Sequence, residues 1–132
     1  MSAVDTVSVK VPLKAEFVSI VRLTASGIAS RLGFDIDTIE DIKVALSEVL
    51  NKIIKNAPEG DSVAIDFSFS DNGILIRFVL DQGVPDRLFD RETDEFAWAI
   101  ISTLMDRMEI HEKGPVWITM EKRLGKAVGD EQ

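Results

Sequence analysis

Residues 37–56 read DTIEDIKVALSEVLNKIIKN, and this stretch decides the fold. Its apolar residues recur at spacings of three and four and form one stripe: Ile39, Ile42, Leu46, Val49 and Ile53. This period is typical of an amphipathic helix with one buried face. Asp37, with Glu40 three residues later, matches a variant of the capping box and predicts the start of the helix. Residues 58–60, which include a proline and a glycine, end it near Asn56.

The residues before this helix predict a strand and another helix. Residues 7–13 alternate apolar and polar side chains, which is the pattern of a half-buried strand. Pro12 cannot donate to a ladder, so it places this strand at a sheet edge or marks its end. Residues 14–32 change to helical spacing, and Gly33 fits a C-terminal stop.

A hairpin follows the central helix. Residues 62–70 alternate apolar and polar side chains, and residues 71–73 supply Asn-Gly, one of the best short hairpin signals. The return strand, residues 74–80, is apolar on both faces. We therefore expect it to be central in the sheet.

The last third of the chain predicts one more helix and a second hairpin. Residues 81–94 are polar and too irregular to predict an element. Residues 95–108 have helical spacing and are apolar over most of the girth, so we expect this helix to be largely buried. Residues 109–111 and 116–121 predict a final hairpin around Gly114-Pro115.

The order of predicted elements is β-α-α-β-β-loop-α-β-β. Strands and helices are partly segregated, which indicates an α+β two-layer sandwich with helices on one face of a mixed, mostly antiparallel sheet. The length of 132 residues suits a single domain, with a core at about 7–123 and a charged tail at 124–132.

The composition limits the classes of function. The chain has 15 Lys and Arg against 23 Asp and Glu, a net charge of −8, and this disfavours DNA and anionic membranes as direct partners. Because there is no cysteine, disulfides, thiolate zinc sites and cysteine nucleophiles are excluded. The first residues do not resemble a signal peptide and no stretch is apolar enough to span a membrane, so we expect a cytoplasmic protein.

The strongest candidate for chemistry is one flank of the predicted central helix. At about 100° per residue, Asn51 and Lys52 lie close to Glu48, beside the apolar stripe. A carboxylate beside an amide and an ammonium can act as a base next to a metal or phosphate site. The alternative is a solvated helix face with an i,i+4 Glu–Lys pair.

A second candidate lies at the end of the predicted central strand. Asp81 can accept a hydrogen bond from a ligand amino group, and Gly83 permits a close backbone approach. The alternative is an ordinary turn. His111 is the only histidine, so it makes a poor metal site and is more simply a surface or hydrogen-bonded core residue.

Taken in order, the elements resemble the anti-sigma factor serine kinases of the RsbW/SpoIIAB type, within the GHKL ATPase superfamily. The strongest segments are residues 39–48, IEDIKVALSE, and residues 101–109, ISTLMDRME. The resemblance implies a Bergerat-type fold that holds ATP and Mg²⁺ between sheet and helices. It also implies a homodimer that regulates transcription in stress response or sporulation. Its partners would be a sigma factor and an anti-anti-sigma (STAS-type) protein, whose serine it phosphorylates.

The resemblance also assigns roles to individual residues. Glu48 matches the N-box glutamate, the base that activates water or the serine hydroxyl. Asp81 matches the aspartate that binds the adenine amino group, and Gly83 belongs to the same box. The phosphate lid aligns with residues 95–98, which include Ala97 as a nucleotide-binding position.

The sequence departs from the family pattern at three places. Lys52 stands where the family has its Mg²⁺-binding asparagine, and Asn51, one residue earlier, is the candidate metal ligand. Lys52 could instead neutralise phosphate charge directly. Val84-Pro85 replaces the end of the adenine-binding box, and residues 95–98 contain no glycine. Two hypotheses therefore stand side by side: an active serine kinase, and a non-catalytic protein-binding module that has lost the use of ATP.

Overall fold

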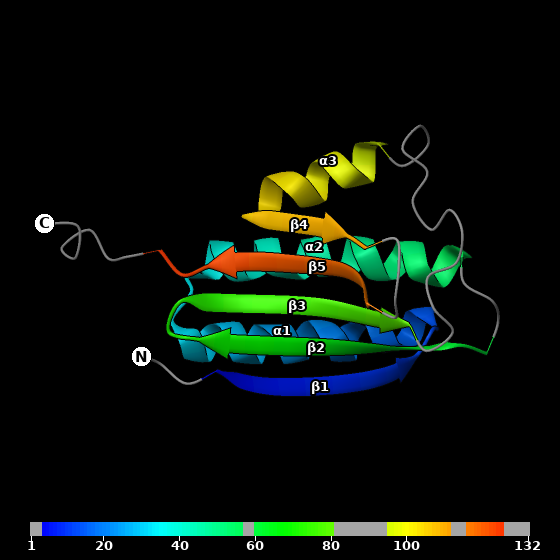
Figure 1. The fold of residues 1–132 in the computed structure, drawn as a ribbon, viewed down its shortest axis with the longest axis horizontal. Coiled ribbons are helices and arrows are strands. Elements are labelled where there is room, and N and C mark those ends of the chain that lie inside the picture. The colour runs from blue at the N-terminus through cyan, green and yellow to red at the C-terminus, as the bar shows by residue number, and fades with distance from the viewer. Residues whose placement is uncertain (1–3, 57–59, 81–94, 112–115, 126–132) are drawn as a thin grey trace, which may run out of the picture.

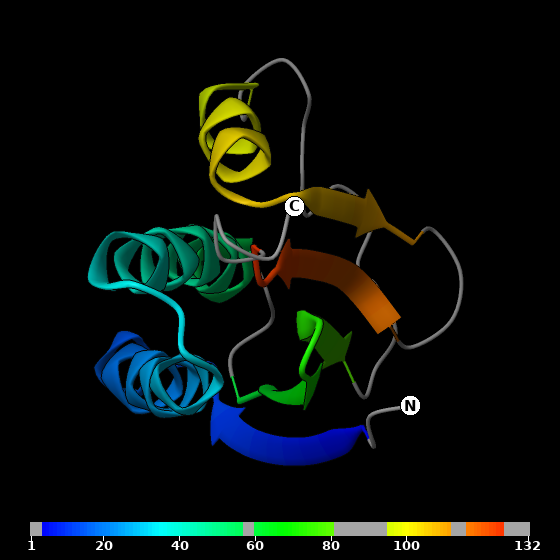
Figure 2. The same cartoon turned by 90° about the vertical axis from the view of Figure 1, so that its left-hand side faces the viewer.

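The computed structural model describes residues 4–56, 60–80, 95–111 and 116–125. The predicted order of elements is confirmed. The elements are β1 (Asp5–Pro12), a short 3₁₀ turn η1 (Ala15–Phe17), α1 (Val18–Leu32), α2 (Ile36–Asn56), β2 (Ser62–Ser70), β3 (Gly73–Leu80), α3 (Glu95–Leu104), β4 (Arg107–Ile110) and β5 (Val116–Arg123). The helices cover one face of the sheet, and α2 lies between α1 and α3 (Figure 1, Figure 2). This is the predicted α+β two-layer sandwich.

The sheet has five strands in the order β1-β2-β3-β5-β4. All four of these strand pairs are antiparallel, so the expected mostly antiparallel sheet is confirmed, and these pairs contain no parallel component. β3 is central, as its apolar composition predicts. β1 is an edge strand that ends at Pro12, as the missing N–H of proline predicts.

The core lies between the sheet and the helices. From α2 it receives four side chains of the predicted stripe that are fully buried: Ile42, Leu46, Val49 and Ile53. From the sheet it receives alternate residues of the central strands, including Phe67 and Phe78, which are also fully buried. The apolar side chains placed by the helical period and those placed by the strand period therefore pack together in one apolar layer.

The start of α2 differs from the sequence-based expectation. The helix begins at Ile36, and its cap is Asp35 rather than Asp37. The Asp35 carboxylate accepts a hydrogen bond from the Thr38 N–H at 2.7 Å, and its carbonyl accepts one from the Ile39 N–H at 3.0 Å. Asp37 lies in the first turn instead. The prediction of Asp37 as the cap was wrong because two aspartates compete there, and only Asp35 binds the exposed N–H groups.

The last helix also differs, in length and in burial. α3 ends at Leu104 and not at Met108, because the next residues pair with the sheet. The Asp106 N–H donates to the carbonyl of Glu121, and the Asp106 carboxylate accepts the Arg123 N–H at 2.6 Å. The expectation of a largely buried helix was wrong as well, because Ile101 is its only buried residue and Phe96 is 83% exposed.

The C-terminal end of α1 and the turn of the β2–β3 hairpin agree with prediction, whereas α1 begins at Val18, after the 3₁₀ turn η1, and not at Lys14. α1 is followed by Gly33 at φ +90°, and the Gly33 N–H donates to carbonyls of the last turn. The hairpin turns at Asp71-Asn72 and re-enters the sheet at Gly73. The predicted loop at 81–94 and the turn at Gly114-Pro115 lie outside the described residues.

Candidate functional site

The candidate site lies at one end of the sandwich. β3 and α2 run toward this end, and α3 begins there, at the right of Figure 1. The topology therefore brings together residues of α2 and α3 that are more than forty positions apart in the sequence. Polar residues at the end of a buried strand and on the flanks of two helices are a common setting for a ligand.

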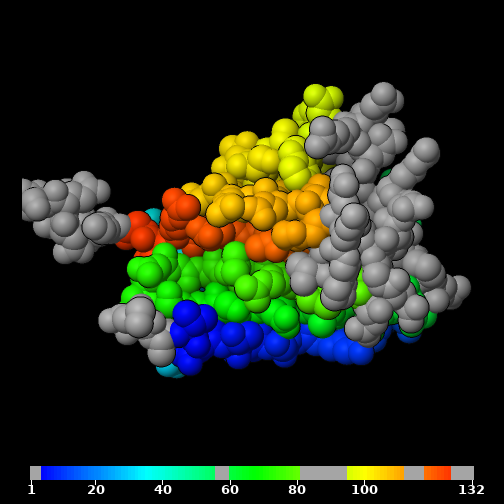
Figure 3. Space-filling model, in the orientation of Figure 1, coloured from blue at the N-terminus to red at the C-terminus, as the bar shows by residue number. Residues whose placement is uncertain are grey.

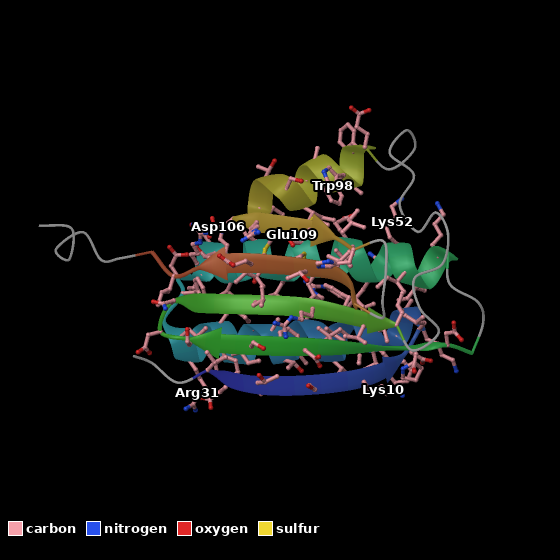
Figure 4. The ribbon with its side chains drawn as sticks, viewed as in Figure 1. Lys10, Arg31, Lys52, Trp98, Asp106 and Glu109 are labelled. Carbon is pink, nitrogen blue, oxygen red and sulfur yellow. The ribbon has the colours of Figure 1, made fainter. Side chains whose placement is uncertain are left out.

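One wall of the site is the flank of α2 predicted from the sequence. Glu48 and Lys52 are both half-buried, whereas Asn51 is exposed. Residues four apart on a helix are neighbours, so the carboxylate and the ammonium share one strip of surface. Figure 4 shows Lys52 at the end of α2 that lies nearest to the start of α3.

The second wall is the first half of α3. Ala97 and Trp98 are half-buried there, and Figure 4 shows Trp98 on the helix above the end of α2 that carries Lys52. Trp98 lies within residues 95–98, the segment that the resemblance aligns with the phosphate lid. The sequence assigned no role to Trp98 itself, because its place relative to α2 depends on how α3 packs. The single sequence signal was its position inside residues 95–98.

Four of the six predicted site residues lie on described helices, α2 and α3, that pack against each other. Glu48, Asn51 and Lys52 come from α2, and Ala97 comes from α3. Asp81 and Gly83 lie outside the described residues. Asp81 directly follows Leu80, the last residue of β3, and Gly83 comes two residues later. Their predicted role in binding adenine therefore stays a prediction.

The described residues do not fit a protein-held magnesium site. Among them, no three His, Cys, Asp or Glu side chains gather in a way that could hold a metal ion. Mg²⁺ requires oxygen ligands in an octahedral shell. Glu48 and Asn51 offer such oxygens, but the half-buried position one turn after Glu48 is Lys52, which offers none.

His111 takes the role of a satisfied polar residue. Its Nε2 lies 2.9 Å from the Thr119 hydroxyl on β5, within hydrogen-bonding distance. This agrees with the simpler of the two sequence-based interpretations of His111.

The pKa values of Asp35 and Arg123 are shifted by their hydrogen-bond partners. Hydrogen bonds from the side chain and the backbone N–H of Thr38 lower the pKa of the Asp35 carboxyl. A hydrogen bond to Glu121 raises the pKa of the Arg123 guanidinium. Asp35 directly precedes α2 and Arg123 ends β5, and Figure 1 shows both of these element ends on the side of the sandwich opposite the start of α3.

The residues of β2 that alternate with its buried positions, such as Asp66 and Ser68, lie on the face of the sheet opposite the helices, and Figure 3 shows the strands from this face. At the end that carries the β2–β3 hairpin, a groove of about 630 Å³ is lined by Ser70, Asn72, Arg123 and their neighbours. It lies at the other end of the strands from the candidate site.

No described helix is long and apolar enough to cross a membrane.

Comparisons with known proteins agree with this architecture. Residues 11–122 match the model of the histidine kinase-like ATPase domain. A protein of Halalkalibacterium halodurans named serine-protein kinase RsbW is 34% identical over 137 aligned positions, which cover 91% of this chain and 84% of that protein. Proteins of the same name from Bacillus thuringiensis and Bacillus anthracis are 42% identical over 86 positions. That alignment covers 64% of this chain and about half of each Bacillus protein, at 53%.

Proposed function

Because the chain belongs to the family of histidine kinase-like ATPase domains, we propose that it is an anti-sigma factor of the partner-switching type. In this proposal it binds ATP and phosphorylates a serine of an anti-anti-sigma (STAS-type) protein. The relatives named serine-protein kinases support the activity. The observation that carries the proposal is the half-buried Glu48 on α2, one helical turn before Lys52, which Figure 4 shows at the end of α2 nearest to the start of α3.

The proposed roles follow from the two walls of the site. ATP would lie between α2 and α3, with Asp81 and Gly83 binding adenine and Ala97 contributing its backbone near the phosphates. Lys52 would neutralise part of the phosphate charge. By resemblance Mg²⁺ would accompany the nucleotide, where the Asn51 amide oxygen is the candidate protein ligand; the described residues hold no cluster of three His, Cys, Asp or Glu side chains for the metal.

The proposed reaction places Glu48 as the general base. The Glu48 carboxylate takes the proton of the partner serine hydroxyl, and the serine oxygen attacks the γ-phosphorus. The bond from the γ-phosphorus to the oxygen that bridges to the β-phosphate breaks, and ADP leaves. Phosphoryl transfer depends mainly on positioning and on stabilised charge, so a well-placed base and cation are the features that matter.

A phosphotransfer assay tests this function. The wild-type chain is incubated with γ-labelled ATP and a STAS-type partner, and label on the partner serine is measured. We expect Glu48→Gln to slow transfer by about 100-fold or more while ATP binding, measured by calorimetry, is retained. Glu40→Gln is the matched control, because Glu40 is exposed on the same helix two turns earlier. Equal rates in the two variants would exclude Glu48 as the base.

A second function is favoured by Lys52 and by the absence of glycine from residues 95–98. In this alternative the chain is a non-catalytic module that binds its protein partners without using ATP. The same assay separates the two functions. Binding of the STAS-type partner without any transfer, together with no ATP binding, would establish the module and reject the kinase.

The assembly and partners are also proposals. We propose a cytoplasmic homodimer that binds a sigma factor and releases it when the STAS-type protein competes. Light scattering at micromolar concentration measures the assembly, and a mass near the single-chain value of 14.6 kDa would contradict the dimer. Competition between purified sigma factor and STAS-type protein for the chain tests the switch.

A further inference from the structure

The flank of α2 at the candidate site carries a positive charge, which is supplied by the side chain of Lys52. Lys52 is half-buried one turn after the half-buried Glu48, and the more exposed Asn51 lies beside them. Of the residues on this strip, only Lys52 is a cation. A lysine side chain reaches past its own helix turn, so its charge can be presented toward the start of α3.

The Lys52 ammonium has the opposite chemical properties to a metal ligand. A protonated ammonium has three N–H donors and no lone pair, so it binds phosphate oxygens directly but cannot bind Mg²⁺. A divalent cation at the same place would be repelled by the lysine charge. Because the ammonium has three donors, one can remain with a protein partner while the others face a phosphate.

The charge of the whole chain favours such a cation at a nucleotide site. A triphosphate approaches a molecule of net charge −8, and at the site it meets the carboxylate of Glu48. A positive group within a few ångströms is the direct way to offset that repulsion in a partly buried site. The described structure offers Lys52 there and no metal-binding cluster.

We propose that Lys52 takes the place of the divalent cation, so that this chain binds a nucleoside triphosphate without Mg²⁺. This inference rests on the proposed function for the presence of a nucleotide between α2 and α3. It goes further by assigning the charge neutralisation to a single side chain and by making the binding independent of metal.

Calorimetric titration of ATP into the full chain tests it, once with excess EDTA and once with excess MgCl₂. We expect the wild-type affinity to be the same within about threefold in the two buffers. Lys52→Asn removes the cation and supplies an oxygen. It should lose on the order of tenfold in affinity in EDTA and regain it with Mg²⁺.

The matched control is Lys43→Asn. Lys43 lies nine residues earlier on α2, about half a turn around the helix from Lys52, and pairs with Glu40 at 3.0 Å. This control should bind ATP as the wild type does in both buffers. Circular dichroism melting of both variants shows that each is folded.

The possible failures are distinct. If the wild type binds no ATP in either buffer, the proposed function fails. If it binds ATP only with Mg²⁺, or if Lys52→Asn binds as the wild type does in EDTA, the role of Lys52 is overturned while the nucleotide site stands. A metal-independent wild type with a metal-dependent Lys52→Asn variant supports the inference.

Discussion

At the residue scale, the start of α2 depends on which of two aspartates caps the helix. Asp35 accepts the Thr38 N–H, and hydrogen bonds from Thr38 keep the pKa of its carboxyl below the usual range. Asp37 lies in the first turn, where it interacts only with the helix dipole. A capping carboxylate that is directly hydrogen-bonded contributes more than a nearby charge, so the two residues have different expected effects.

We predict that Asp35→Ala lowers the thermal midpoint at neutral pH by a few degrees, and by more than Asp37→Ala does. Because the folded-state pKa of Asp35 is lowered, its contribution is complete above the unfolded carboxyl value of about 3.9. The contribution is lost as pH falls through the lower folded value. Melting curves of the three proteins from neutral to acid pH measure this. Equal effects of the two substitutions, or a difference that does not shrink in acid, would contradict the assignment of the cap.

A second residue-scale feature is Gly73, where the hairpin re-enters the sheet. Its φ is +141°, and a Cβ there would lie 2.3 Å from the carbonyl oxygen of Lys122, a backbone atom that cannot simply rotate away. By contrast, Gly27 is exposed within α1, and a Cβ there would meet nothing within 4 Å. Substitution by alanine should therefore lower the free energy of unfolding at Gly73 and raise it at Gly27.

We predict that Gly73→Ala lowers the free energy of unfolding by about 3 kcal/mol, through backbone strain and displacement of β5. Gly27→Ala should raise it by about 0.5–1 kcal/mol, because alanine has the higher helix propensity. Urea unfolding followed by circular dichroism measures both. An unchanged Gly73→Ala variant would mean that the hairpin and β5 separate without cost.

At the element scale, the prediction was accurate where one pattern dominates and failed where two compete. The apolar stripe of α2 and the alternating pattern of β2 each define a single face that can be buried. In both elements the structure buries that face. The end of α3 was misplaced because helical spacing continues to Met108, yet Asp106 and the following residues form hydrogen bonds with β5. Pairing between residues about fifteen positions apart is not visible in a local pattern.

α3 also shows why the burial of a helix could not be predicted from its composition. α3 is apolar over much of its girth, but it lies beyond α2 at the side of the layer and can bury only one face. Ile101 is fully buried, whereas Phe96 is 83% exposed and Ala99 faces solvent as well. The number of faces a helix buries depends on its neighbours in space, which the sequence of the helix does not contain.

We predict that Ile101→Ala lowers the free energy of unfolding by about 2–5 kcal/mol, since it leaves a cavity in the core. Phe96→Ala should change it by less than about 0.5 kcal/mol, as is usual for an exposed side chain. Chemical denaturation of both variants at one protein concentration measures the difference. A large loss in Phe96→Ala would show that Phe96 is covered in solution, for example by a second copy of the chain.

At the scale of the whole molecule, the candidate site could be predicted only in part. Helix geometry places Glu48, Asn51 and Lys52 near one another, because they share one helix. It could not place Ala97 or Trp98 with them, since their proximity depends on α3 packing beyond α2. The family resemblance supplied that connection, which stays a prediction, and the described structure shows that α2 and α3 pack against each other.

The charge of the whole molecule bears on its partners. The net charge of −8 is accompanied by cations placed beside carboxylates on the outer face of the sheet. Arg77 on β3 lies directly opposite Asp66 on β2, and Arg123 pairs with Glu121 at 2.7 Å. Nonspecific DNA binding requires unopposed Lys and Arg side chains that displace counterions from phosphates. On this described face the pattern favours a protein partner.

We predict that the chain does not bind a labelled DNA duplex in fluorescence anisotropy at about 0.1 M salt, where surface charges act over roughly 10 Å. The reason is that like charge repels the two molecules, and on the described face of the sheet the cations lie beside carboxylates. Saturable binding that weakens steeply with added salt would contradict this. If the prediction holds, an effect of this chain on transcription has to pass through a protein that itself contacts DNA, and a sigma factor is such a protein.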